Sequence, residues 1–254
     1  MNAKTDAIAV FDSGVGGISV LRQLRRLMPG ETFLYLGDSA NAPYGTRPTD
    51  QIRQLSLDVA AKLVARGVKA LVVACNTATA AAIETLRQTY PELIVVGIEP
   101  ALKPAADRFP GGTIGVLATP VTLNEEKFQQ LAAPYGGLCT VVKLPAPGLS
   151  ELVEHGEGDS EAAEKLLRPL LEPWVGKLDA LVLGCTHYPF ATATIRRILG
   201  DRIPLLDGGE GTARETKRRL VQAGLLNEAE GKIIIENSLD DPKLLELSHK
   251  LLEG

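Results

Sequence analysis

Short apolar stretches alternate along this chain with longer segments in which apolar residues recur at helical spacing. Each stretch is apolar at consecutive positions, which is the pattern of a strand that is covered on both faces of a sheet. The expected strands are Ile8–Phe11, Thr32–Leu36, Ala70–Ala74, Ile94–Ile98, Ile114–Leu117, Ala180–Leu183 and Ile203–Leu206. Alternating strands and helices predict an α/β fold with mainly parallel sheets.

Polar residues and prolines predict where some of the intervening helices begin or bend. Two pairs of residues have the spacing of a capping box at a helix start: Thr122 with Glu125, and Thr212 with Glu215. Pro169 lies inside the helical pattern of Glu161–Trp174. We expect it to kink or split that helix, because proline lacks the backbone N–H that a helix interior needs.

The chain contains an internal repeat, which is clearest around two of its cysteines. Residues 70–76 align with residues 180–186, with four of the seven positions identical, and each segment is an expected strand that runs into a cysteine, Cys75 or Cys185. The strands before and after these segments end in matching polar residues: Ser13 with Thr119, and Glu99 with Asp207. The repeat predicts two pseudo-symmetric α/β halves.

These halves give a domain prediction with one cysteine in each domain. The first domain is expected to contain residues 1–98 and 208–254, with Cys75, and the second residues 99–207, with Cys185. Each thiol is expected at the carboxyl end of a strand, just ahead of a helix, which is where ligands bind in open α/β sheets. If the halves face each other, both thiols lie in one interdomain cleft, which would then be the active site.

Two opposed thiols fit one particular reaction. Inverting an amino acid at its α-carbon requires a base on one face and an acid on the other, and a thiolate and a thiol can exchange these roles. A free cysteine has a pKa of about 8.5, and a helix N-terminus or a nearby cation lowers it. A lone buried cysteine usually packs as a small hydrophobic residue. The matched positions of Cys75 and Cys185 favour catalysis, whereas Cys139 has no match and is expected to be structural.

Other polar residues near the strand ends are candidates for assisting roles. Asp12 begins a glycine-rich turn, residues 12–17, that lacks the third glycine of a dinucleotide-binding loop. The turn could hold a carboxylate or only reverse the chain, while Asp12 could accept a proton from Cys75 or orient a substrate. His187 follows Cys185 closely and could tune that thiol, shuttle its proton or cap the next helix.

Composition and charge exclude several other classes of function. A net charge of −4 with scattered Lys and Arg gives no basic surface for nucleic acid. No apolar run reaches the roughly 18 residues of a membrane helix, and the start does not fit a secretory signal. Three widely spaced cysteines indicate a reducing compartment, so we expect a cytoplasmic protein. No metal-binding, pyridoxal or nucleotide motif is found, so we expect no cofactor and no metal.

Five motifs in order along the chain resemble those of the glutamate racemases, within the aspartate/glutamate racemase superfamily. They are Phe11–Leu21, Gly37–Ser39 with Ala42–Gly45, Ala74–Thr79, Gly97–Ala101 and Gly184–Pro189. The Asp240–Pro242 stretch is similar too, so the resemblance covers nearly the whole chain. It implies two pseudo-symmetric domains with glutamate in the cleft between them, and a homodimer, as in many members.

The resemblance also implies a role for individual residues. Cys75 and Cys185 are the two bases, assisted by Asp12 on the Cys75 side and by His187 and Glu154 on the Cys185 side. The substrate contacts that it implies are Asp12, Ser13, Pro43, Tyr44, Gly45, Asn76, Thr77, Thr119, Thr186 and His187. Two departures from the family pattern are Ala146-Pro147 in place of Cys-Pro, and Gly208 in place of a serine after Asp207.

Three other functions remain open from the sequence. A decarboxylase or cis–trans isomerase of the superfamily would need only one of the two thiols. A cysteine hydrolase using Cys185 and His187 would leave Cys75 unexplained. A carboxylate- or phosphate-binding protein without enzymatic activity would not require cysteine at both repeat positions.

Overall fold

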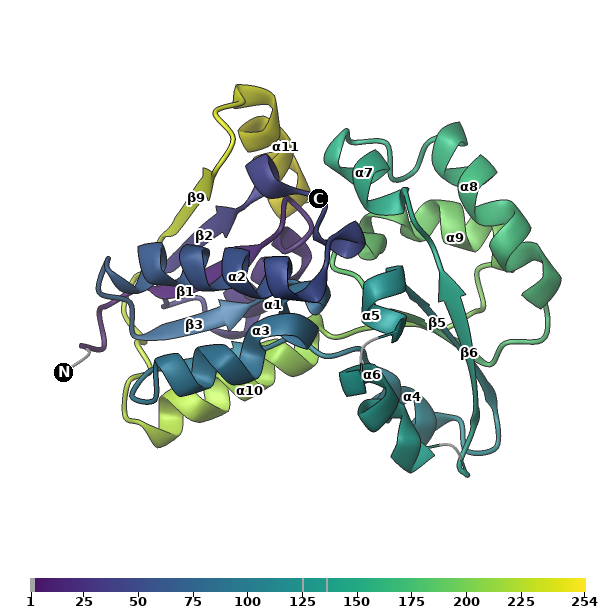
Figure 1. Ribbon diagram of the computed structural model, residues 1–254, viewed down its shortest axis with the longest axis horizontal. Helices are drawn as coiled ribbons and strands as arrows, with labels where there is room; N and C mark the ends of the chain where they lie inside the picture. The colour runs from purple at the N-terminus through teal and green to yellow at the C-terminus, as the bar shows by residue number, and fades with distance from the viewer. Residues whose placement is uncertain (1–2, 125, 136) are drawn as a thin grey trace.

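The computed structural model describes residues 3–124, 126–135 and 137–254, and within this part the strands form two parallel sheets in two lobes (Figure 1). The first sheet has the order β4-β3-β1-β2-β9 and the second has the order β6-β5-β7-β8. The strands are β1 Ile8–Asp12, β2 Phe33–Gly37, β3 Ala70–Val73, β4 Ile94–Gly97, β5 Thr113–Ala118, β6 Thr140–Pro145, β7 Ala180–Leu183, β8 Leu205–Asp207 and β9 Ile233–Asn237. The predicted α/β fold is confirmed.

Helices cover both faces of each sheet. On the first sheet, α1 (Ile18–Leu27), α10 (Gly209–Gln222) and α11 (Pro242–Glu253) share one core, and α2 (Thr49–Val64) and α3 (Asn76–Thr89) share the other. On the second sheet, one core contains α4 (Leu102–Arg108), α5 (Pro120–Asn124) and α6 (Glu126–Ala132), and the other contains α7 (Leu149–Glu154), α8 (Glu161–Leu171) and α9 (Thr192–Leu199). Short 3₁₀ helices are η1 Ser39–Asn41, η2 Tyr44–Thr46, η3 Ala133–Tyr135, η4 Glu172–Trp174 and η5 Tyr188–Ala191.

The central strand β1 shows why the strand sequences are apolar throughout. Ala9 and Phe11 pack against α2 and α3, whereas Ile8 and Val10 pack against α1 and α10. All four side chains are fully buried. Burying a large apolar side chain stabilises the fold by roughly 1.5–3 kcal/mol, so a polar residue at either face would be costly.

The internal repeat in the sequence is a repeat in topology. The order β4-β3-β1-β2 in the first sheet matches β8-β7-β5-β6 in the second. The register matches as well, because Phe11 pairs with Val73 and the equivalent Leu117 pairs with Leu183. Strand β9 has no equivalent in the second sheet of the described residues. The two halves are therefore pseudo-symmetric, with an extra strand on the first.

The chain crosses between the lobes at two connections. It leaves the first sheet after β4 and enters the second lobe at α4, then returns after β8 into α10, which packs against α1. Among the described residues, no helix is both long and apolar enough to cross a membrane.

Some local predictions from the sequence are wrong or incomplete. Strands β6 and β9 were not expected, because both are edge strands, with a single buried residue in β6 and none in β9. Thr212 does not cap a helix, since α10 already begins at Gly209, and the Thr122 pair cannot be compared because Glu125 lies outside the described residues. Helix α8 continues through Pro169, ends two residues later and passes into η4.

Candidate active site

A cavity of about 450 Å³ lies between the two lobes, where the carboxyl ends of the strands of both sheets meet. Residues that follow β1, β2, β3, β5 and β7 line it, together with residues from α7 and from the segment around the start of α11. The lining residues are Ser13, Ser39, Ala42, Pro43, Tyr44, Gly45, Cys75, Asn76, Thr77, Thr119, Ser150, Glu151, Glu154, His155, Cys185, His187, Leu239, Asp241, Lys243, Leu244 and Leu247.

Cys75 sits at the start of α3 in the wall of this cavity. It is the N-cap of the helix, and its sulfur accepts a hydrogen bond from the backbone N–H of Ala78 at 3.4 Å. The hydroxyl of Ser13 lies 3.7 Å from the same sulfur. Burial, followed by the negative charge of Asp12, raises the pKa of Cys75 to about 12. The thiol form is therefore strongly favoured in the free protein.

Cys185 has a different environment, because no α-helix begins directly after it. A turn and the 3₁₀ helix η5 follow instead, and its sulfur lies 3.6 Å from Nδ1 of His187. Nε2 of His187 in turn lies 2.7 Å from Oε1 of Glu154. Burial lowers the pKa of His187, but its contacts with Cys185 and Glu154 outweigh burial and raise that pKa well above 6.5. The second thiol is thus paired with an imidazole rather than with a helix N-terminus.

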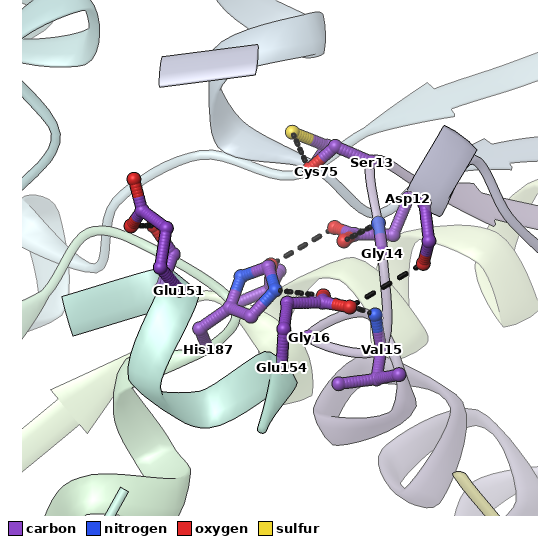
Figure 2. A network of polar contacts seen from close by, with 12 residues as sticks. Asp12, Ser13, Gly14, Val15, Gly16, Cys75, Glu151, Glu154 and His187 are labelled. Carbon is purple, nitrogen blue, oxygen red and sulfur yellow. Dashed lines mark hydrogen bonds and ion pairs between the residues drawn. The ribbon is translucent and has the colours of Figure 1, made fainter. Parts of the chain in front are cut away.

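The glycine-rich turn does hold a carboxylate, and that carboxylate belongs to the protein. The backbone N–H of Val15 donates a hydrogen bond of 2.6 Å to Oε1 of Glu154 (Figure 2). A Cβ on Gly14 would lie 1.8 Å from that oxygen, and a Cβ on Gly16 would lie 2.3 Å from the ring of His187. Glycines are required here because the Glu154–His187 pair of one lobe packs against the backbone of the other.

Asp12 also connects the two lobes. Its carboxylate is fully buried and accepts hydrogen bonds from the backbone N–H of Gly14 at 3.0 Å and from the hydroxyl of Thr186 at 2.9 Å. Burial raises the pKa of Asp12 above 3.8, against the opposing effects of His187 and Thr186. Asp12 acts on Cys75 through its charge, as no hydrogen bond between the two is found in the described residues.

The far wall of the cavity is a cluster of hydroxyl groups with one unsatisfied amide oxygen beside it. The Oγ1 atoms of Thr77 and Thr119 lie 3.2 Å apart, and both lie near that of Thr122. Oδ1 of the buried Asn76 accepts no hydrogen bond within the described residues. A buried acceptor without a donor is costly, so this wall is suited to a ligand that brings a donor.

The described residues contain no group of three or more His, Cys, Asp or Glu side chains arranged to hold a metal ion. The cavity contains two thiols from equivalent positions of the two lobes, and each thiol has different partners.

The family model of the Asp/Glu/Hydantoin racemases matches residues 16–216 of this chain. The chain belongs to the Asp/Glu/Hydantoin racemase family.

Relatives across the whole length place the chain with the glutamate racemases in this family. It is 48% identical to the glutamate racemase of Clostridium acetobutylicum, with all of both chains covered. Its fold is similar to that of glutamate racemase from Francisella tularensis in complex with D-glutamate, with 26% identity, a TM-score of 0.85 and 99% and 95% of the two chains covered. It is also similar to Escherichia coli glutamate racemase in complex with L-glutamate and the activator UDP-MurNAc-Ala, with 30% identity, a TM-score of 0.83 and 98% and 94% covered.

The racemase structure brings most of the predicted site residues to one cavity. Cys75, Cys185, Glu154 and His187 line it, as do the predicted contacts Ser13, Pro43, Tyr44, Gly45, Asn76, Thr77 and Thr119. Asp12 and Thr186 are not among the lining residues, because their side chains bond to each other. Their direct contact with a substrate stays a prediction. Cys139 is buried away from this cavity, and His249 is exposed.

Several lining residues of the racemase were not expected from the sequence. Ser39 follows β2 and donates a hydrogen bond of 3.3 Å to Oε2 of Glu154. Lys243 and Leu247 come from α11, near the end of the chain. His155 is exposed and also lines the cavity. The sequence signals nearest to them were two stretches that resemble the family, Gly37–Ser39 and Asp240–Pro242.

Proposed function

We propose that this chain interconverts L- and D-glutamate, with Cys185 and Cys75 acting on opposite faces of the α-carbon and without a cofactor. The observation that carries the proposal is that thiols from equivalent positions of the repeat line one cavity between the lobes. The related structures from Francisella tularensis and Escherichia coli hold D-glutamate and L-glutamate respectively. A cavity of about 450 Å³ is within the range of small-molecule sites.

The environments of the two thiols support a direction for each proton. Starting from L-glutamate, Cys185 as the thiolate removes the α-proton, and Cys75 as the thiol delivers its own proton to the other face. Cys75 suits the donor role, since burial and Asp12 favour its protonated form. His187, held by Glu154, faces the Cys185 sulfur at 3.6 Å and is placed to exchange a proton with it. Starting from D-glutamate, the two thiols exchange roles.

Polar groups in the cavity wall fit the remaining groups of an amino acid. The free Oδ1 of Asn76 can accept a hydrogen bond from the α-ammonium group. The hydroxyls of Thr77, Thr119 and Ser13 can donate to carboxylate oxygens. Such fixed donors, in a site closed to water, would stabilise the negative charge that develops when the α-proton leaves.

The wider role follows the family. We propose that the protein is cytoplasmic, acts as a homodimer and supplies D-glutamate for peptidoglycan synthesis. D-Glutamate is the product that the relatives' activity implies, and the reduced state needed for two free catalytic thiols is maintained in the cytoplasm.

The test is an assay of the purified chain, dialysed against a chelator, on L-glutamate with chiral detection of the product. We expect D-glutamate to accumulate to a one-to-one mixture, and added metal or pyridoxal phosphate to leave the rate unchanged. A rate that appears only after one of them is added would contradict the cofactor-independent mechanism. No D-glutamate under any condition would contradict the function.

The arrangement of Cys185, His187 and Glu154 also fits a cysteine hydrolase, in which a base activates the thiol and an acid orients the base. Incubation with glutamate amides and esters, followed by intact mass measurement, separates the two functions. A hydrolase would release ammonia or alcohol through an acyl-enzyme at Cys185. A racemase would not, and Cys75 would have no role in a hydrolase.

A further inference from the structure

Glu154 receives a second set of contacts, which comes from the first lobe and ends at the extra strand β9. Oε1 of Glu154 already accepts from Val15 and His187, while Oε2 accepts from the hydroxyl of Ser39 at 3.3 Å. Nδ2 of Asn237 donates to the oxygen of Ser39 at 2.9 Å. Asn237 is the last residue of β9, so the strand that has no equivalent in the second half reaches the Cys185 side of the site through two side chains.

Hydrogen-bond direction along this path is fixed by the chemistry of the groups. The backbone N–H of Leu239 donates to Oδ1 of Asn237 at 2.9 Å, so the amide must present its NH₂ group to Ser39. An NH₂ group can only donate, and the Ser39 oxygen must therefore accept from it. The single hydroxyl proton of Ser39 is then left for Glu154.

The backbone around Asn237 is shaped for this contact. Gly37 pairs with Asn237 in the parallel register of β2 and β9, and a Cβ on Gly37 would lie 3.0 Å from Nδ2 of Asn237 and 2.6 Å from the carbonyl oxygen of Gly14. A side chain at position 37 would thus press on the amide that reaches Ser39. The neighbouring Ser238 contacts the same loop differently, since its hydroxyl oxygen accepts from the backbone N–H of Ala40.

We infer that Asn237 and Ser39 are positioning residues for the proposed racemisation: Asn237 directs the hydroxyl proton of Ser39 to Glu154, which in turn holds His187 against Cys185. The inference rests on the proposed function for its effect on turnover. Asn237 does not line the cavity but reaches it through Ser39 and through the backbone of Leu239, from whose N–H it accepts a hydrogen bond. With the proton of Ser39 turned away, Oε2 would lose its donor and Glu154 would hold the imidazole less firmly.

Replacing Asn237 with aspartate tests the direction of the hydrogen bond without changing side-chain size. Asn237→Asp keeps an acceptor for Leu239, but it presents a second acceptor to Ser39, so the hydroxyl proton turns away from Glu154. Asn237→Ala removes the amide, so the Ser39 hydroxyl can donate to Glu154 or turn away from it. We expect kcat to fall roughly tenfold in Asn237→Asp and less in Asn237→Ala, with KM for glutamate within about twofold of wild type.

The opposite order would overturn the inference, because a residue that only shapes the turn should tolerate the isosteric aspartate better than alanine. Ser238→Ala is the matched control in the adjacent position, and we expect its kcat to stay within about twofold of wild type. Circular dichroism and thermal unfolding check that each variant folds.

A second pair of variants separates the hydroxyl from a through-space effect of the new charge. In a Ser39→Ala background, Asn237→Asp should lower kcat no more than Asn237→Ala does, because the hydroxyl proton that the aspartate would redirect is absent. An equal penalty in both backgrounds would overturn the inference and indicate a simple charge effect on Glu154.

The ¹⁵N chemical shifts of the His187 imidazole give a readout that does not depend on turnover. We expect Asn237→Asp to change these chemical shifts when Ser39 is present and to leave them unchanged in the Ser39→Ala variant. If wild type fails to racemise glutamate while these shifts respond as expected, the proposed function fails and the positioning path stands. If wild type racemises and neither kcat nor the shifts respond, the positioning path fails alone.

Discussion

His187 binds Glu154 through a contact of 2.7 Å between Nε2 and Oε1 while its other ring nitrogen faces Cys185. Both side chains of the pair are largely buried, and the N–H of Val15 holds the same carboxylate oxygen. The two partners of His187, rather than solvent, therefore determine which tautomer or charge state of the imidazole is favoured.

The Glu154–His187 pair should stabilise the fold over a defined pH range. Burial raises the pKa of Glu154, but the hydrogen bond from His187 outweighs this and lowers it below 4.5, and the pKa of His187 lies well above 6.5. The carboxylate contribution is present above pH 4.5 and is lost as pH falls through the folded pKa of Glu154. The imidazolium contribution is complete below pH 6.5 and is lost as pH rises through the folded pKa of His187.

Glu154→Gln should therefore destabilise the protein most between pH 4.5 and pH 6.5, where both contributions are present. The expected loss is about 3 kcal/mol, since the substitution leaves the buried His187 unpaired. Thermal unfolding of wild type and variant across the pH range measures the difference. Glu151→Gln is the control, because that carboxylate bonds to its neighbour Ser150. A difference independent of pH would show that the loss is one of packing.

Asp12→Asn should slow turnover more than it weakens binding. The substitution keeps the side-chain size and an acceptor for Gly14, but it removes the negative charge that helps to raise the pKa of Cys75. We expect kcat to fall by about 100-fold, because the changed charge beside Cys75 disturbs the proton transfer at that thiol, with KM nearly unchanged. The pKa of Cys75 should also fall, which the pH dependence of thiol alkylation measures. If KM rises and kcat does not change, Asp12 binds substrate instead.

Both cysteines should be required in both directions. Each direction needs an acid and a base, so Cys75→Ala and Cys185→Ala should each abolish racemisation of either enantiomer. Cys139→Ala is the matched control, as that thiol lies outside the cavity. Near-normal racemisation without Cys75 or Cys185 would show that one base is enough.

In heavy water, starting from L-glutamate, the D-glutamate formed first should carry deuterium at the α-carbon. Unreacted L-glutamate should keep its protium early in the reaction, because Cys185 removes the proton and Cys75 returns a solvent-derived one. Mass spectrometry of the separated enantiomers measures both. Early exchange into L-glutamate as fast as product forms would favour a single base.

The enzyme should prefer glutamate to aspartate. A cavity that anchors both carboxylates of the substrate loses a fixed contact when one methylene is removed, and misplacing the α-carbon by about 1 Å slows proton transfer. We expect kcat/KM for L-glutamate to exceed that for L-aspartate by about 100-fold. Equal values would assign the chain a broader amino-acid specificity.

The buried strands, the two halves and a thiol at equivalent strand ends were all predictable from the sequence. Continuous apolar stretches indicate strands covered on both faces, and the repeat around Cys75 and Cys185 requires no knowledge of contacts. The edge strands β6 and β9 escaped, because their residues are mostly half-exposed and lack that pattern. The residues at a strand end follow the strand directly in the sequence, so they also lie next to it in space and can be identified without knowledge of the fold.

The partners of those strand ends depend on contacts between segments that are far apart in the sequence. Val15 and Glu154 are 139 residues apart, Thr186 and Asp12 are 174 apart, and Asn237 and Ser39 are 198 apart. Such contacts leave no periodic signal, because the first two depend on how the lobes dock and the third on the pairing of β9 with β2 within the first lobe. Cys75 lies at a helix N-terminus and Cys185 lies beside an imidazole; both contacts are made within three residues of the thiol, but the matching repeats conceal this asymmetry.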